Sequence, residues 1–551
     1  MAARWWLIAV LLVSLAGLGY QIHKVGLASG FVDTVGRVRA QDEAVYAHSA
    51  IRMAREGDWL TPKFLGRYAL YKPPLLYWLS GVSAKLLGVS AFSLRLPSLL
   101  AGTLVCVLVF AWLRKSHSLA AAVAAVILLL SNQLWHVLSR LCLTDVLLAL
   151  WTVAALFCLS RDPTLAGRPS SWGVGIFSAA AILTKGIAGT LPLFILLVYS
   201  VLAPREQRPP GRRIAQVWLL AVLLALPWHL YQLAVHPRWF WAEYVQVEIL
   251  TFGTGSPYQT SAENHVSFYL RRLLLADPVL CLLATAAAPW AAVAWRQRKS
   301  PLAALLVSWL AVLAAALLLF QYRNAAYLMT WVPALAILAT AYGPVFGVRR
   351  AAMVTGALGL LFVAKAQFPD RPWGLSFQTG TTVQAAPLLD AYARLGRPND
   401  LVLVSPDDEF YSAVLPLPRV RYCFIEPGDT PHPQLLDFRY LGINVTAGQF
   451  DELRKWRGVF LQRLRAWGLD SEEPIATVIV ARSMEELVKT VLAHPNTDFF
   501  LPEALRSAID PRAGATHRIV RASPEKFFLL GNSGTGDEFG RRNSSPVPEL
   551  R

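Results

Sequence analysis

The stretch from Asp42 to Trp78, DEAVYAHSAIRMAREGDWLTPKFLGRYALYKPPLLYW, is the first long polar segment of an otherwise apolar chain. It directly follows the first hydrophobic run. It opens with two adjacent carboxylates, continues in a helix-like segment, and reaches a lysine that stands before two prolines. The stretch is longer, and richer in charges and aromatic residues, than a simple connection between two hydrophobic runs requires. We therefore interpret it as a functional loop.

The composition of the whole chain indicates an integral membrane protein. Of its 551 residues, 55% are hydrophobic and 16% are charged, whereas a soluble protein has about 25% charged residues. The net charge of +17 would agree with nucleic-acid binding. However, many of the basic residues stand in short loops between hydrophobic runs, where they set orientation in the membrane. We expect no nucleic-acid partner, and the five cysteines form neither a disulfide framework nor a zinc pattern.

Eleven apolar runs are predicted to cross the membrane, since a spanning helix needs about 20 apolar residues. They lie at 5–23, 96–113, 119–136, 143–160, 172–184, 187–203, 214–231, 273–295, 301–320, 327–346 and 351–366. A twelfth stretch, 74–88, is short and contains Lys85. If it lies in the interface and the N-terminus is inside, all strong basic clusters between spans fall on one side, as the positive-inside rule requires. We therefore expect the first loop and the C-terminal region outside.

The chain is predicted to fold as an α-helical polytopic membrane protein with a small C-terminal α/β soluble domain. Residues 1–366 form the membrane domain, and residues 28–95 within it form the catalytic first outer loop. Residues 367–531 alternate between strand and helix patterns, which favours an outer-face α/β domain that binds the acceptor or is structural. Residues 532–551 have the composition of a disordered tail. The expected strands lie at 401–404, 420–425, 477–480, 516–522 and 526–530, and the helices at 383–395, 450–467 and 484–493.

A series of short motifs follows the acidic pair in a defined order. They are GDWL-x-P at 57–62, KPPL-x-YW at 72–78, RLPS at 95–98, LTD at 143–145, TKG at 184–186, PW at 227–228, His265 with Phe268-Tyr269, and Y-L-x(4)-P-A-L-A at 327–336. In order and placement, these motifs resemble the membrane glycosyltransferases of the protein O-mannosyltransferase and lipid A aminoarabinose transferase superfamily. The resemblance covers about residues 1–365. It implies a GT-C fold and a polyprenyl-phosphate-linked sugar as donor.

Two positions depart from the aminoarabinose transferases within that superfamily. Val45 stands where those relatives have an arginine, and Tyr71 stands where they have a glutamate. In the relatives, that glutamate and a loop histidine can hold a metal ion. We expect no required cofactor or metal here, with a divalent metal as the alternative. The departures weigh against the aminoarabinose subgroup and leave the superfamily unaffected.

Four residues of the expected outer face are candidates for binding the donor phosphate. Lys72, held by the following prolines, is the first choice, because its charge can offset the negative charge that develops as the glycosidic bond breaks. Lys185 and Arg323 are candidate helpers, and Tyr327 is a candidate hydrogen-bond donor. The alternative for each cation is contact with lipid headgroups, and it weighs most for Arg323.

The carboxylates and the later loop supply the remaining candidates. Asp42 is the expected general base, because a carboxylate beside a second one can have a raised pKa. Glu43 is either catalytic or structural. Asp145 either orients the sugar or acceptor or pairs with Arg140 at helix ends.

The later outer loop, residues 232–272, combines carboxylates with aromatic side chains that can hold a sugar or a lipid. The candidates there are His265, Tyr269 and Glu248. The alternative is an interfacial aromatic belt.

We hypothesise that the protein moves a sugar from a polyprenyl-phosphate donor to a lipid, glycan or protein acceptor. By the resemblance, we expect inversion at the sugar and a site on the extracytoplasmic face of a bacterial plasma membrane. A transporter or flippase for lipid-linked saccharides is one alternative, although such proteins usually contain internal repeats and none is visible here. A non-enzymatic binding subunit is the other, but it would not need to keep Asp42 and Lys72.

Overall fold

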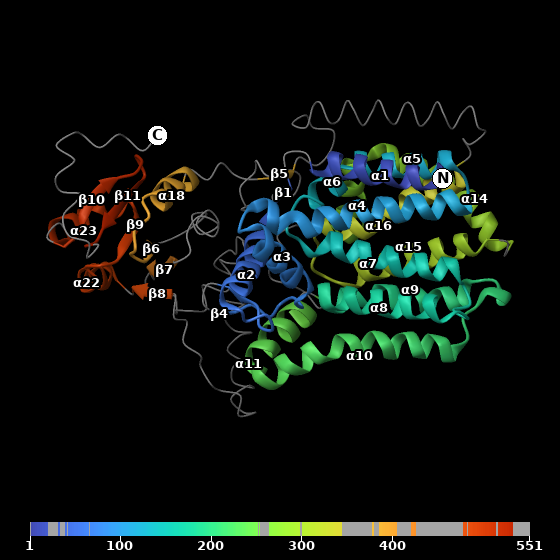
Figure 1. The fold of residues 1–551 in the computed structure, drawn as a ribbon, viewed down its shortest axis with the longest axis horizontal. Coiled ribbons are helices and arrows are strands. Elements are labelled where there is room, and N and C mark those ends of the chain that lie inside the picture. Colours follow the sequence, from blue (N-terminus) through green and yellow to red (C-terminus); the bar gives the residue numbers. More distant parts are fainter. Residues whose placement is uncertain are drawn as a thin grey trace.

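The computed structural model comprises a helical bundle and a separate small sheet domain (Figure 1). It describes residues 2–19, 31–33, 39–40, 42–64, 67–251, 253, 264–297, 300–343, 377–379, 385–404, 420–425, 478–481, 483–513 and 516–532. The expected span at 351–366, the helix at 450–467 and the tail at 533–551 lie outside these residues.

The long helices of the bundle lie side by side and run along one common direction (Figure 1). They are α1 (Ala2–Gly19), α4 (Ala91–Ser116), α5 (Leu119–Ser131), α7 (Thr144–Arg161), α8 (Arg168–Lys185), α9 (Leu191–Leu202), α10 (Gly211–Val235), α14 (Pro278–Arg296), α15 (Pro301–Leu319) and α16 (Trp331–Tyr342). Each of the ten predicted spans that begin within the described residues overlaps one of these helices. The hydrophobic pattern alone therefore located the bundle.

Within the described residues, seven segments are long and apolar enough to cross a membrane. Three further apolar helices are shorter: Trp5–Gly19, Leu75–Leu87 and Leu119–Ser131. One of the seven segments, Arg168–Leu202, consists of two helices joined by the 3-10 turn η1 (Gly186–Thr190). A Cβ atom on Gly189 would lie 2.2 Å from the Ala181 backbone, so this turn packs tightly back onto α8.

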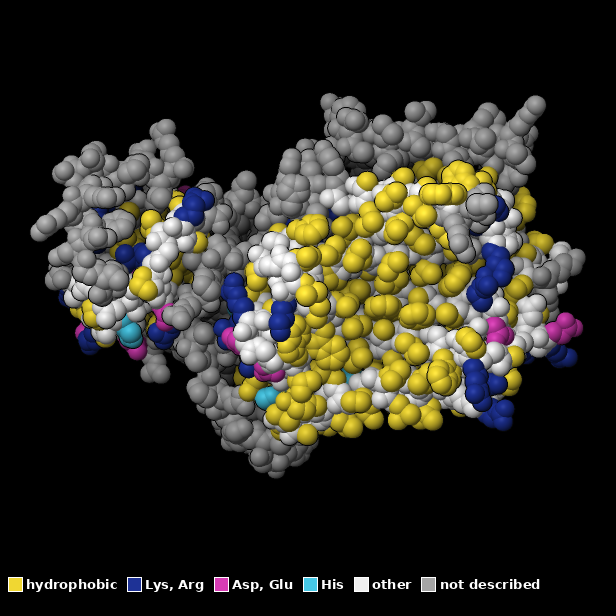
Figure 2. All heavy atoms as spheres, viewed as in Figure 1, with side chains coloured by type: hydrophobic (Ala, Val, Ile, Leu, Met, Phe, Trp, Pro, Cys, Tyr) yellow, Lys and Arg dark blue, Asp and Glu magenta, His cyan; other side chains and the backbone are white. Residues whose placement is uncertain are grey.

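The outside of the bundle is apolar, as contact with lipid requires. Helix α10 exposes much of its length, including Leu219, Leu223 and Leu230, which are 59%, 56% and 52% exposed. Figure 2 shows a continuous hydrophobic face that is bordered by basic side chains at both ends of the bundle. Soluble monomers rarely expose contiguous apolar patches of more than a few hundred Å². The protein is therefore an integral membrane protein.

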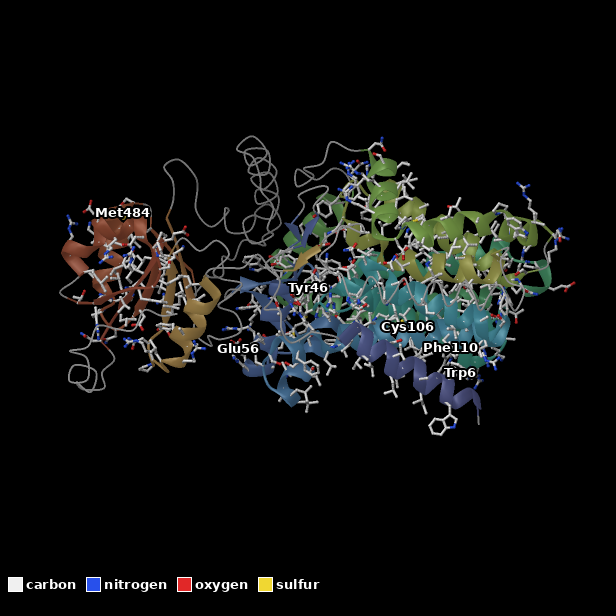
Figure 3. All side chains as sticks on the ribbon, turned by 90° about the horizontal axis from the view of Figure 1, so that it is seen from above. Trp6, Tyr46, Glu56, Cys106, Phe110 and Met484 are labelled. Atoms are coloured by element: carbon white, nitrogen blue, oxygen red, sulfur yellow. The ribbon has the colours of Figure 1, made fainter. Side chains whose placement is uncertain are left out.

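Shorter elements cap one end of the bundle. Helices α2 (Asp42–Glu56) and α3 (Leu75–Leu87) lie there, together with the two-stranded hairpin of β3 (Lys63–Phe64) and β4 (Arg67–Tyr68). Figure 3 places Tyr46 and Glu56 of α2 at this end, whereas Trp6, Cys106 and Phe110 lie further along the bundle.

Helix α3 is the predicted interfacial segment, and it packs against α2 and α4. It exposes Val82, Leu86 and Leu87, which are 47%, 77% and 57% exposed. Tyr77 of α3 is buried, with its ring edge-on to that of Tyr46. Its apolar ring fills the contact between α3 and α2.

The remaining short helical elements connect or extend the long helices. They are α6 (Gln133–Leu138), η2 (Arg205–Gln207), α11 (Pro237–Trp239), the π-helix η3 (Phe240–Thr251), α13 (His265–Ala276) and the 3-10 segment η4 (Ala325–Thr330).

The small domain is a six-stranded sheet with the order β10-β11-β9-β6-β7-β8. Its strands are β6 (Leu401–Val404), β7 (Val420–Ile425), β8 (Val478–Ala481), β9 (Asp498–Pro502), β10 (Arg518–Arg521) and β11 (Lys526–Leu530). Strands β6 to β9 pair in parallel, and the β10–β11 hairpin joins β9 in antiparallel pairing. The predicted α/β architecture is confirmed. Strand β9 was not predicted.

Helices cover both faces of this sheet. Helix α18 (Ala385–Arg394) stacks Tyr392 on Phe528 of β11. On the other face, α22 (Met484–Ala493), η5 (Glu503–Leu505) and α23 (Arg506–Ala513) cover alternate residues of the same strands, such as Val402. A third sheet pairs β1 (Phe31–Asp33) with β2 (Arg39–Ala40) and with β5 (Phe377–Thr379), so the segment before α2 lies beside the start of the small domain.

A buried carboxylate connects the segments of the small domain. Asp498 is fully buried and accepts hydrogen bonds from the Tyr392 hydroxyl, the Arg397 guanidinium, the Asn399 amide and the backbone N–H of Gly531. These donors come from α18, from the segment between α18 and β6, and from the end of β11. A buried charge is tolerated only when its lone pairs are satisfied in this way.

We predict that Asp498→Ala destabilises the small domain by about 3–5 kcal/mol, because it leaves the Arg397 charge without its carboxylate partner. Pulse proteolysis of the full-length protein in detergent measures the change. The matched control is Glu485→Ala, which removes an exposed ion pair with Lys489 and is expected to leave stability nearly unchanged, because solvent screens such a pair. Equal proteolysis of the two variants would contradict the structural role of Asp498.

Candidate functional site

Glu43 joins three elements at the capped end of the bundle. It is 1% exposed and accepts hydrogen bonds from Arg95 Nε at 2.6 Å and Nη2 at 2.8 Å, in bidentate geometry. Its Oε1 atom also accepts from the backbone N–H of Cys142 at 2.9 Å. Arg95 lies on α4 and Cys142 lies just before α7, so this one carboxylate fixes α2 against both. Asp42 is the first residue of α2, and its side chain lies outside the described atoms.

Lys72 forms an ion pair with Glu248 of the π-helix η3. The Lys72 side chain is 12% exposed and the Glu248 side chain is 19% exposed. The pair is thus partly buried, where the attraction between charges is stronger than in water. The structure thus brings together two residues predicted from the sequence, Lys72 of the first loop and Glu248 of the later loop.

A second ion pair of the same kind joins Lys185 and Asp145. Lys185 Nζ lies 2.5 Å from Asp145 Oδ1, and the two side chains are 10% and 9% exposed. Lys185 also lies 4.8 Å from the centroid of the Tyr327 ring. Both Asp145 and Glu248 are within electrostatic reach of the Tyr327 hydroxyl. The two ion pairs and this tyrosine therefore belong to one site.

The loop that carries Lys72 is fixed by hydrogen bonds to α10 and α3. The Leu60 carbonyl accepts from Trp228 Nε1 at 2.8 Å and from Gln232 Nε2 at 2.7 Å. The Trp59 carbonyl accepts from Trp78 Nε1 at 2.5 Å. The GDWL-x-P, KPPL-x-YW and PW motifs thus contact one another. They position Lys72 without touching its ammonium group.

The π-helix η3 is fixed to the same loop through residues that the sequence did not single out. Glu243, which is 6% exposed, accepts a hydrogen bond from the Leu70 backbone N–H at 2.5 Å. The Tyr244 hydroxyl lies 2.9 Å from His229 Nε2. Burial, and then the nearby Glu248, raise the pKa of Tyr244, so the phenol stays protonated. His229 Nδ1 donates to the Ala225 carbonyl at 2.8 Å, so its Nε2 accepts from the Tyr244 hydroxyl.

Gly186 brings the TKG turn against the π-helix. Its φ is +54°, a conformation that L-residues with a side chain rarely adopt. A Cβ atom there would lie 2.6 Å from the Tyr244 hydroxyl oxygen. Glycine is therefore required on two independent grounds, and the close approach places Lys185 beside η3.

The segments around His265 and Arg323 form the adjoining wall. His265 Nε2 lies 3.1 Å from the Phe320 carbonyl oxygen. Arg323 lies 5.8 Å and Arg272 lies 3.4 Å from the centroid of the Phe268 ring.

The neighbouring Tyr269 is buried, and burial raises its pKa, although the backbone of Asn324 and the charges of Arg323 and Arg272 act against this rise. Tyr269 and Glu248 are also both within electrostatic reach of Tyr327. This electrostatic proximity connects the wall to the two ion pairs.

Tyr71 and His265 stand at the two positions that the resemblance connects with a metal ion. Tyr71, at the glutamate position, is buried and supplies no carboxylate. His265 contacts a backbone carbonyl. In the part of the chain that the structure describes, no group of three or more His, Cys, Asp or Glu side chains could hold a metal.

Comparison with known proteins agrees with the sequence motifs. The family described as dolichyl-phosphate-mannose-protein mannosyltransferase matches residues 32–241. The undecaprenyl phosphate-alpha-4-amino-4-deoxy-L-arabinose arabinosyl transferase of Pectobacterium carotovorum is 31% identical over 230 residues, which are 37% of this chain and 38% of the relative. That of Pseudomonas paraeruginosa is 30% identical over 325 residues, 54% of each chain. This chain therefore spans less than two thirds of the length of these curated relatives.

The fold comparison extends over nearly the whole chain. The crystal structure of ArnT from Cupriavidus metallidurans bound to undecaprenyl phosphate superposes with a TM-score of 0.65 at 17% identity, covering 96% of this chain and 98% of that one. Residues 32–241 are thus similar to the mannosyltransferase family, and the chain as a whole has the fold of ArnT. The GT-C fold expected from the motifs is thereby confirmed, and the small sheet domain is part of the matched region.

We predict that Glu43→Gln lowers the thermal midpoint of this GT-C protein by about 5 °C or more, because several kcal/mol are lost when a buried arginine loses its ionic partner. Thermal-shift measurements in detergent test this. Arg52→Ala is the control on the same helix, since it removes a partly exposed pair with Glu56 that is worth about 0.5 kcal/mol or less. An unchanged midpoint for Glu43→Gln would refute a structural role for this carboxylate.

Proposed function

We propose that the protein is a membrane glycosyltransferase that moves a sugar from a polyprenyl-phosphate donor to a lipid, glycan or protein acceptor. The observation that carries the proposal is the pair of partly buried lysines, Lys72 and Lys185, at the capped end of the bundle, each beside a carboxylate. A lipid phosphate needs cations at the edge of an apolar surface. The names of the matched relatives, and the undecaprenyl phosphate in the ArnT structure, support this donor class.

Lys72 takes the role of phosphate ligand. When the bond between the sugar C1 atom and the phosphate oxygen breaks, negative charge builds up on the leaving phosphate, and a fixed ammonium group stabilises that charge. Lys185 adds a second cation, and Tyr327 can donate a hydrogen bond to the same group. Arg323 lies further along the wall. Its contacts agree with a role beside the phosphate and equally with a role beside lipid headgroups.

Asp42 takes the role of general base, which accepts the proton of the acceptor hydroxyl as that oxygen bonds to C1. A single displacement of this kind inverts the configuration at C1. Glu43 holds Asp42 in place through Arg95, so we assign Glu43 a positioning role. Asp145 orients Lys185. His265 and Tyr269 line the wall where the sugar or acceptor would lie.

We propose that the site faces the extracytoplasmic side of a bacterial plasma membrane. The basic ends of α4, α7 and α14, which contain Arg114-Lys115, Arg161 and Arg296, lie at the end of the bundle opposite to α2 and α3. The positive-inside rule puts such clusters in the cytoplasm. The pairing of β1 with β5 supports placing the small domain on the same side as the site.

The chain divides into three parts under this proposal: a membrane transferase domain at 1–366 with the catalytic loop 28–95, an outer-face domain at 367–531, and a tail at 532–551. A transporter is less well supported, because the charged pairs gather at one end of the bundle, whereas transporter sites usually lie near the bilayer midplane.

We predict that Lys72→Ala lowers kcat/KM for sugar transfer by about 10²–10³-fold, as loss of one electrostatic donor to a transition state typically does. The measurement offers the reconstituted protein a panel of polyprenyl-phosphate sugars and follows release of polyprenyl phosphate. Asp42→Asn is expected to lower kcat while KM for the donor changes little, because the base does not hold the phosphate.

The matched control is Lys85→Ala. Lys85 is an exposed lysine of α3 that lies 5.7 Å from the Trp59 ring centroid and outside the two ion pairs, so transfer should continue at the wild-type rate. If the wild-type protein binds the donors but transfers no sugar to any acceptor, the glycosyltransferase proposal fails. If Lys72→Ala transfers as fast as the wild type, the site assignment fails.

A further inference from the structure

Glu248 occupies the position at Lys72 that a donor phosphate would need. Its carboxylate contacts the Lys72 ammonium directly. A phosphate oxygen seeks the same charge and the same hydrogen-bond donors as a carboxylate oxygen. Both side chains are partly exposed, so an incoming anion has access to the pair.

The π-helical form of η3 directs two of its carboxylates toward the loop that carries Lys72. Glu243 and Glu248 are five residues apart, and hydrogen bonds from i to i+5 bring such residues to nearly the same face of a π-helix. In an α-helix, the same spacing would turn the second side chain by about 140° from the first. The rare helical form thus accounts for both contacts with the loop.

The two carboxylates differ in what they bind. Glu243 is buried and accepts from the Leu70 backbone N–H, a partner that cannot move away from the loop. Tyr244, beside it, is held by His229 and packs against Gly186. Glu248 is bound to a side-chain ammonium at the more exposed end of the helix. It can therefore leave Lys72 while Glu243 and Tyr244 keep η3 in place.

We propose that the Glu248 carboxylate competes with phosphate groups for the Lys72 ammonium. The donor displaces Glu248 from Lys72 when it binds, and Glu248 returns to Lys72 to expel the product. This inference rests on the proposed function. After transfer, the polyprenyl phosphate product is a monoester with one more ionisable oxygen than the donor diester, so it binds a cation more strongly than the donor does. A carboxylate that competes for Lys72 weakens both complexes and speeds release of the product.

The competition has a measurable consequence for affinity. The apparent dissociation constant of an anion at Lys72 equals the intrinsic constant divided by the fraction of molecules in which Glu248 has released the ammonium. Glu248→Gln keeps the size of the side chain and removes its charge. We expect this variant to bind a polyprenyl phosphate about tenfold more tightly than the wild type, a difference of ~1.4 kcal/mol.

The test is calorimetric titration of the full-length protein in detergent with farnesyl phosphate, and with farnesol as the ligand that lacks the phosphate. The variants are Glu248→Gln, Lys72→Ala and the double variant, with Glu485→Gln in the small domain as the charge-matched control. Glu248→Gln should tighten farnesyl phosphate binding alone. In the Lys72→Ala background the same change should alter the dissociation constant by less than about twofold, since coupled residues deviate from additivity.

The outcomes separate this inference from the function on which it rests. If the wild type binds farnesyl phosphate and Glu248→Gln binds it equally or more weakly, Glu248 is not a competitor and the inference is overturned. The inference is also overturned if Glu248→Gln tightens farnesyl phosphate binding equally in the wild-type and Lys72→Ala backgrounds. If no variant binds either farnesyl phosphate or undecaprenyl phosphate, the proposed function fails as well. Should Glu248→Gln lower the thermal midpoint, Glu248→Ala and Glu248→Ser provide the same comparison.

Discussion

Pairing of charges at the edge of an apolar bundle is the constraint on which this structure depends. Charged groups near the membrane interior are costly unless they are paired or reach water. Among the described residues at the capped end of the bundle, the buried and partly buried ion pairs Glu43–Arg95, Asp145–Lys185 and Glu248–Lys72 meet this requirement. They form a gradient from fully buried to partly exposed. The innermost pair fixes helices, and the outer two leave their lysines within reach of an anionic ligand.

Several uncharged residues hold in place the segments that carry these ion pairs. The tryptophans of the first loop and of α10 bind backbone carbonyls, and Gly186 lets the TKG turn approach Tyr244. None of these residues has a charged group that could contact a substrate. They explain why motifs spread over the first half of the chain form one site, and why the similarity to relatives is concentrated at residues 32–241.

The sequence allowed much of the bundle to be predicted, because spanning helices are long apolar runs. It also allowed Lys72, Lys185, Asp145 and Glu248 to be selected, since charged residues near membrane spans are rare. It could not show which lysine pairs with which carboxylate, because each pair joins segments far apart in the chain. The π-helix was also not predictable, since its form depends on contacts of Glu243 and Tyr244 with distant residues. Strand β9 was missed because its apolar run is short and reads equally well as a buried helix segment.

The pairing of β1 with β5 has a consequence for the order in which the molecule is assembled. Strand β1 precedes the second helix, whereas β5 follows the last described helix of the bundle. Proteins are synthesised from the N-terminus at about 5–20 residues per second, so β1 waits for its partner until nearly the entire membrane part has been made. The contacts of the first loop with α10 and η3 also wait for later segments. The capped end of the bundle is thus completed late, and a chain truncated before β5 would leave β1 without this strand partner.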